Sequence, residues 1–163
     1  METNITKQRA IEALREYRIA VRLINGLMTE ALDRWSRQEP QETIAYSEAE
    51  ISRYQEARVH LQNSMWLNPF FPACHALLAN AYGEIDGDVK LQFQYYNSAL
   101  ELDPDDDDVL VARMKMHMDA ARIDDAERDL AHLGSLESSH APPMADHLER
   151  LRNGGESGKG GHR

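Results

Sequence analysis

The sequence contains one cysteine, few prolines, and few glycines before its last ten residues. Because Cys74 is the only cysteine among 163 residues, an internal disulfide is excluded. The chain has six prolines, and more than half of its nine glycines follow residue 150. The other residues are rich in Ala, Leu, Glu, Arg and Gln, whose side chains lose little freedom in a helix. This composition predicts an all-α protein.

Positive charge and long apolar runs are also scarce. The chain has 28 acidic against 18 basic residues, which gives a formal net charge of −10. A surface of this sign repels phosphate backbones, so we expect no nucleic-acid partner. No segment approaches the ~20 consecutive apolar residues that a membrane span requires, and no secretory signal is recognisable. We therefore expect no membrane span and a cytoplasmic location.

Motifs that would indicate catalysis or a cofactor are missing or incomplete. The sequence lacks G-x-S-x-G, H-E-x-x-H and G-x-G-x-x-G. The segment "GGESGKG" resembles a phosphate loop, but Asn153 stands where the first glycine belongs and Gly160 where Ser or Thr belongs. The methionines of "MKMHMD" at 114–119 are more typical of core filler than of a metal site. We predict no enzyme, no cofactor and no metal site, and a small metal-binding or enzymatic protein is the least favoured alternative.

Residues 1–37 are predicted to form one long helix. Apolar residues recur at alternating steps of four and three from Ala10 to Trp35, which is one stripe of a helix. Asn4 or Thr6 could cap its start. Such a stripe can pack on its own domain, which we favour, or form a dimer seam. The candidate dimer face consists of Leu14, Tyr17, Val21, Ile24 and Met28.

The rest of the chain contains an internal period of about 35 residues. The segment "MWLNPFFPACHALLANAY" at 65–82 aligns without gaps with "LELDPDDDDVLVARMKMH" at 100–117. In this alignment Leu67 falls on Leu102 and Pro69 on Pro104. "YQEAR" at 54–58 recurs as "IDDAE" two periods later. Periods near 34 in a helical sequence are typical of stacked helix-turn-helix units, each of which needs its neighbours to complete a core.

These residues resemble the tetratricopeptide repeat (TPR) family. The middle repeat carries the motif best, at positions Ala79, Tyr82, Tyr96, Ala99, Leu100, Leu102 and Pro104. Gln92 departs from the small residue usual in the second helix, and one extra residue lies near Gly87. The resemblance implies a TPR-like α-solenoid of three degenerate repeats, at about 38–70, 71–105 and 106–136. We expect a linker and capping helix at 137–152, with the helix from Met144 to about Leu151, and a flexible tail at 153–163.

The resemblance also implies a concave groove, lined by the first helix of each repeat, that binds another protein. The groove positions of this chain include Glu39, Glu42, Tyr46, Glu50, Asn80, Glu84, Asp108, Lys115, Met118 and Asp119. Because acids outnumber the single base, we expect a basic or amphipathic partner segment. The protein would then be an adaptor or scaffold. The alternatives are that these acids are simply the solvated side of the helices, or that the chain is a self-assembling homodimer that uses its N-terminal helix.

The segment "ALELDPDDDDVL" is strongly acidic, with five acids among residues 103–108. An EF-hand loop that began at Asp103 would need a glycine at Asp108 and a glutamate at Met114, so a calcium loop of this type is excluded. Asp105, Asp106 or Asp107 can instead cap the helix that follows. The remaining aspartates exceed what capping requires.

Overall fold

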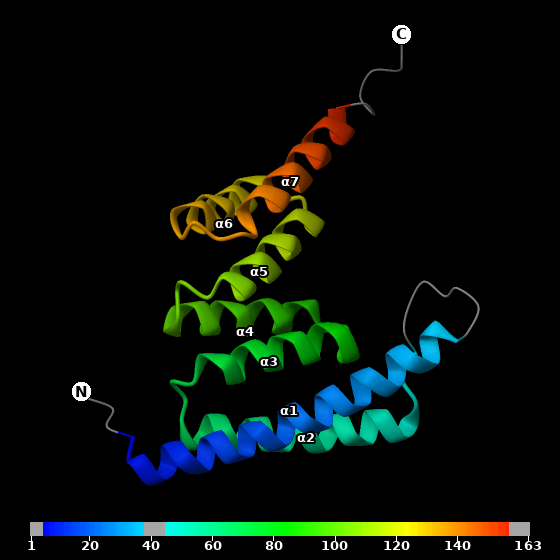
Figure 1. Ribbon diagram of the computed structural model, residues 1–163, viewed down its shortest axis with the longest axis vertical. Helices are drawn as coiled ribbons and strands as arrows, with labels where there is room; N and C mark the ends of the chain where they lie inside the picture. Colours follow the sequence, from blue (N-terminus) through cyan, green and yellow to red (C-terminus); the bar gives the residue numbers. More distant parts are fainter. Residues whose placement is uncertain (1–4, 38–44, 157–163) are drawn as a thin grey trace. The chain divides into compact units, whose positions relative to one another are not determined.

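The computed structural model describes residues 5–37 and 45–156, which are helical and contain no strand. The chain divides into two compact units between Leu102 and Asp103. The N-terminal unit contains α1 (Lys7–Ser36), α2 (Glu48–Leu67), α3 (Pro72–Ala81), the π-helical segment η1 (Tyr82–Asp86) and α4 (Val89–Leu102). The C-terminal unit contains α5 (Asp107–Asp119), α6 (Ile123–Ser135) and α7 (Ala141–Glu156) (Figure 1). The all-α prediction is confirmed. No helix of the described residues is long and apolar enough to cross a membrane.

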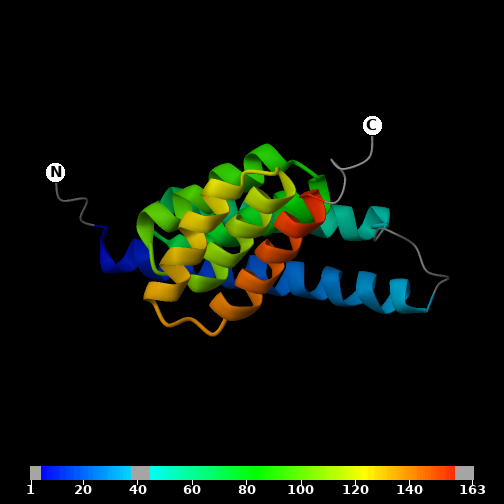
Figure 2. The same ribbon diagram turned by 90° about the horizontal axis from the view of Figure 1, so that it is seen from above.

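α1 begins and ends where the apolar spacing predicted. The Thr6 side chain caps it by accepting a hydrogen bond from the Arg9 amide at 3.3 Å. α1 and α2 lie side by side and antiparallel (Figures 1 and 2). The Ser64 hydroxyl of α2 donates to the Ala13 carbonyl of α1 at 2.8 Å, and this contact is fully buried.

The first helix pair differs from the predicted one. We expected residues 38–70 to hold two helices, the first carrying Tyr46 and Glu50. In the structure, Ser47 caps a single continuous helix, α2, through a capping box with Glu50. α1 supplies the partner helix that completes the pair. Glu39 and Glu42 lie outside the described residues.

The buried stripe of α1 coincides with the predicted one only in part. It consists of Ala13, Ala20, Ile24, Leu27 and Ala31. Three of these are alanines, which let the backbone of α2 approach closely, and Ile24 is the only candidate dimer-face residue among them. This is the packing alternative of the sequence analysis.

The candidate dimer face is therefore largely used inside the N-terminal unit. Ile24 is buried, and the Tyr17 ring packs edge-on against Phe71 with centroids 4.8 Å apart. Met28 accepts a hydrogen bond from the Tyr46 hydroxyl, and Val21 is half-buried. Of the five predicted seam residues only Leu14 is exposed.

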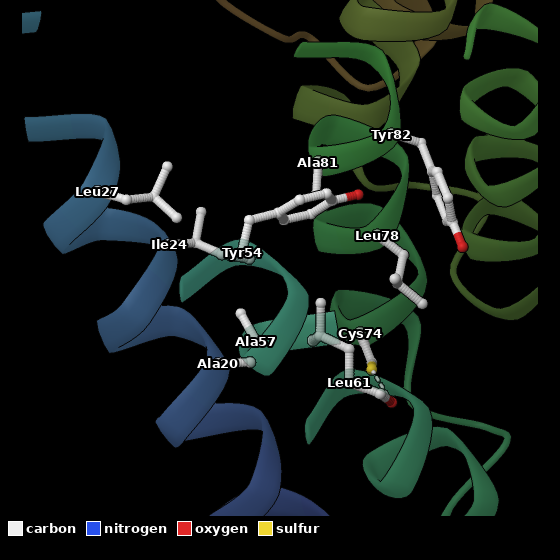
Figure 3. Close-up of a cluster of buried hydrophobic side chains, with 10 residues drawn as sticks. All are labelled: Ala20, Ile24, Leu27, Tyr54, Ala57, Leu61, Cys74, Leu78, Ala81 and Tyr82. Carbon is white, nitrogen blue, oxygen red and sulfur yellow. Dashed lines mark hydrogen bonds between the residues drawn. The ribbon is translucent and has the colours of Figure 1, made fainter. Parts of the chain in front are cut away.

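The core of the N-terminal unit lies between the α1–α2 pair and α3. Tyr54, Leu61 and Cys74 are almost fully buried there, and the Cys74 thiol donates to the Leu61 carbonyl (Figure 3). Burial raises the pKa of this thiol to about 11, so it stays protonated. Cys74 is thus a core residue and not a reactive one.

The π-helical turn η1 accommodates the extra residue predicted near Gly87. A single π turn inserts one residue into a helix without ending it. Gly87 then stops the helix with a left-handed φ of 67°, and the Asp88 amide donates to the Tyr82 carbonyl at 2.9 Å. The predicted turn within the middle repeat is confirmed.

In the C-terminal unit, the predicted cap of α5 is confirmed, but the predicted bounds of the last helix are not. Asp106 caps α5 by accepting from the Val109 amide at 3.1 Å. α7 begins at Ala141 rather than Met144, because Pro142 and Pro143 fit the first turn of a helix, where amides have no helical partner. It continues to Glu156, past the predicted end near Leu151 and into the segment expected to be a flexible tail.

A polar network crosses the core of the C-terminal unit. Arg113 of α5 binds Asp129 of α6 through two hydrogen bonds of 2.6 and 3.1 Å, and both carboxylate oxygens take part. His117 lies 3.7 Å from the same carboxylate, and desolvation lowers the pKa of this histidine. Buried charges of this kind require such pairing, so the network fixes how α5 and α6 face each other.

Candidate functional site

The predicted groove residues of the N-terminal unit gather where α2 begins and α3 ends. Tyr46 immediately precedes the capping residue of α2. Asn80 lies in the last turn of α3, and Glu84 follows in η1. The Glu84 carboxylate is close enough to Tyr46 to raise the pKa of its hydroxyl, after the larger effect of burial. The fold therefore places the Glu84 carboxylate within electrostatic reach of Tyr46, 38 positions earlier in the sequence.

Glu50 belongs to the predicted set but is not available to a partner. Its side chain is 2% exposed, and it accepts two hydrogen bonds from Arg34 at 2.6 and 2.8 Å. It also accepts from the Ser47 amide at 2.7 Å. The Arg34 guanidinium holds the pKa of Glu50 at about 2. Glu50 is a structural residue that joins α1 to the start of α2, and its assignment to the groove was wrong.

Asn80 is exposed at the edge of the site and is held by Tyr96 of α4. The Tyr96 hydroxyl donates to the Asn80 side-chain oxygen, and the Tyr96 ring is buried. The Gln92 side chain hydrogen-bonds the same tyrosine. Gln92 itself packs against Gly83, because any β-carbon there would lie 2.2 Å from its amide. The unusual glutamine of the second helix is thus matched by a glycine on the facing helix.

The electrostatics of the site centre on Glu84. Its side chain reaches solvent, yet neighbouring groups desolvate it and raise its pKa. No base among the described residues pairs with it. The carboxylate lies near two tyrosines, Tyr46 and Tyr96, whose pKa values it helps to raise. An unpaired, partly desolvated acid beside aromatic rings is chemically suited to receive an ammonium or guanidinium group.

The predicted residues of the C-terminal unit lie on α5. Asp108, Lys115 and Asp119 are exposed and share one face, because spacings of seven and four return to the same side of a helix. Met118 is 6% exposed and packs in the core, so its assignment to the groove was wrong.

Sequence reasoning missed a cluster at the start of α5. Asp107, Asp108 and His140 offer three ligand atoms within 4.8 Å of one another. The His140 ring nitrogen lies 3.5 Å from Asp108, and the Ser138 hydroxyl donates to Asp107 at 2.8 Å. The positive end of the α5 dipole at this point stabilises the carboxylates and opposes a cation. The cluster therefore accounts for part of the acidic surplus as a helix-end arrangement.

Comparison with known proteins assigns no family to this chain. No protein-family model matches the chain, no curated protein matches it, and no solved structure matches it.

Proposed function

We propose that this protein is an adaptor that binds a basic or amphipathic segment of a partner protein at the Tyr46–Glu84 site. The observation that carries the proposal is the unpaired Glu84 carboxylate, desolvated beside Tyr46 and exposed to solvent. Removing such a charge from water costs free energy, and a lysine or arginine from a partner would offset that cost with an ion pair and a cation–π contact.

We further infer that the helix pairs are TPR-like repeats that stack to form the groove. α5 starts 35 residues after α3, at Asp107 and Pro72, which equals the sequence period. α6 starts 34 residues after α4. Within the C-terminal unit, the exposed face of α5 carries the predicted groove residues Asp108 and Asp119. With the buried Glu50 left out, five of the six predicted charged groove positions are acidic, which favours a basic partner by complementary potential.

The test is a titration of the protein into a labelled amphipathic peptide of lysine and leucine, followed by fluorescence anisotropy. We expect Tyr46→Ala and Glu84→Gln each to weaken binding by about tenfold, which is the loss of one charge-assisted contact. Glu56→Gln is the matched control, because Glu56 is exposed on the outer side of α2 and no other described side chain pairs with it. Equal weakening by the control, or unchanged binding by both site variants, would overturn the proposal.

A further inference from the structure

The outward face of α1 carries a concentration of positive charge that the acidic groove does not use. Between Lys7 and Arg22 five bases stand against two acids, although the whole chain has a net charge of −10. One of the five, Arg9, is committed to the N-terminal unit. Its guanidinium lies over the Trp66 ring at 5.4 Å and donates to the Trp66 carbonyl at 2.8 Å.

The other four bases share one side of the helix. We call the set Lys7, Arg15, Arg18 and Arg22, with Ile11 among them, the α1 basic face. Their spacing keeps them opposite the stripe that packs on α2, and all are exposed. Ile11 is 53% exposed in the middle of the set. None of the four bases makes an ion pair with any acid among residues 5–37 and 45–156.

The two acids of this stretch hydrogen-bond to groups outside the basic face. Glu16 turns toward α2, where it accepts from Asn63 and lies 2.8 Å from the His60 ring nitrogen. Glu12 accepts from Gln8 of its own helix at 2.7 Å. The contrast with other arginines is clear: Arg34, Arg53 and Arg58 all pair with carboxylates of a neighbouring element.

From this charge pattern we infer that the α1 basic face binds an acidic, amphipathic segment of a partner protein. At 1.5 Å per residue the face is about 23 Å long, which matches four turns of a partner helix. Ile11 would take an apolar side chain between the ion pairs. An anionic membrane or a nucleic acid would bring a broad negative surface against a chain that is itself strongly acidic, so a narrow peptide fits better. This surface is independent of the Tyr46–Glu84 site.

The test uses the full chain and a labelled helical peptide of glutamate and leucine, with a lysine and leucine peptide as the second probe. The variant Arg15→Glu, Arg18→Glu, Arg22→Glu should weaken binding of the acidic peptide by more than about tenfold. The affinity of the wild type should fall as salt rises, because exposed ion pairs are screened. Circular dichroism should show unchanged helicity, since all three side chains point into solvent.

The matched control is Lys90→Glu, Arg128→Glu, Arg150→Glu, which changes the net charge equally at exposed sites outside α1. Retained binding by this control supports the inference, and equal loss in both triple variants contradicts it. The inference is also overturned if the wild type does not bind the acidic peptide but sediments with phosphatidylserine vesicles, and the Arg15, Arg18 and Arg22 triple variant does not. The inference would also be contradicted if the α1 triple variant bound only the lysine and leucine peptide more weakly and the acidic peptide as well as the wild type does. The proposed function is tested separately, because its failure would appear as unchanged binding of the lysine and leucine peptide by the Glu84→Gln variant.

Discussion

At the scale of single residues, the decisive feature is which charges are paired inside the protein. Glu50 and Glu84 both occupied predicted groove positions, yet one is buried against Arg34 and the other pairs with no base in the described part of the chain. The sequence contained a signal for the first case, because serine followed three residues later by glutamate is a capping box. The partner Arg34 could not be read from the sequence, since it lies 16 positions earlier, in another helix.

The Arg34–Glu50 pair predicts a specific pH dependence of stability. The pKa of Glu50 is lowered in the folded protein from an ordinary 4.5 to about 2. Its stabilisation is therefore present above about pH 4.5 and is lost as the pH falls toward 2. Urea unfolding at several pH values should show Glu50→Gln less stable than wild type at pH 7, by about 1–3 kcal/mol.

That difference should become small near pH 2, where about half of the wild-type carboxyl is protonated. Glu48→Gln serves as control, because Glu48 is exposed in the same helical turn. A constant difference between Glu50→Gln and wild type across the pH range would contradict the assigned pairing.

At the scale of helices and turns, the fold departs from regular helix geometry and from the repeat motif where one unusual residue makes room for another. The π turn η1 and the Gly83–Gln92 contact are one such place. The sequence indicated the extra residue and the unusual glutamine, but not that they meet. Likewise, the spacing of apolar residues located both ends of α1 and part of its packing face, including Ile24 and Ala31, but close approach through alanines left the larger Leu14 outside the buried stripe.

The Gly83–Gln92 contact can be tested with a double-mutant cycle. Gly83→Ala should destabilise the protein by about 1 kcal/mol, because the new methyl group displaces the Gln92 amide. In a Gln92→Ala background the same substitution should be neutral or stabilising, since alanine favours a helix over glycine. Thermal unfolding of the four proteins gives the coupling. Additive effects would show that the two residues do not compete for space.

Two helices of the C-terminal unit end in left-handed residues that are not glycine. Ala121 follows α5 with φ 55°, and Glu137 follows α6 with φ 54°. The hydrogen bonds Arg122 to His117 and Ser138 to Leu133 close both turns. Because a β-carbon costs roughly 1–2 kcal/mol in this conformation, Ala121→Gly and Glu137→Gly should each raise the free energy of unfolding by up to about 1 kcal/mol.

The control for these turns is Gly87→Ala, at φ 67°, which should destabilise by about 1 kcal/mol. Chemical denaturation measures all three variants. If the two glycine substitutions lowered stability, the left-handed conformations assigned to Ala121 and Glu137 would be contradicted.

At the scale of the whole molecule, the sequence was sufficient for the helical class, the 35-residue spacing and two helix caps, those of α1 and α5. Those features depend on local patterns and on one alignment of the chain with itself. The pairing of α1 with α2, the burial of Met118 and the outward position of the α1 basic face depend on contacts between distant segments. We propose that the protein is an acidic adaptor with two binding surfaces of opposite charge, one at Tyr46 and Glu84 and one on α1.

The most direct test of the central claim is the pKa of the Glu84 side chain, measured by carboxyl carbon NMR with and without the lysine and leucine peptide. Free protein should show a pKa above the ordinary value, because Glu84 is desolvated and unpaired. Binding should lower that pKa, since a cation beside the carboxylate favours its charged form. Saturating peptide that leaves the pKa of Glu84 unchanged would contradict the account.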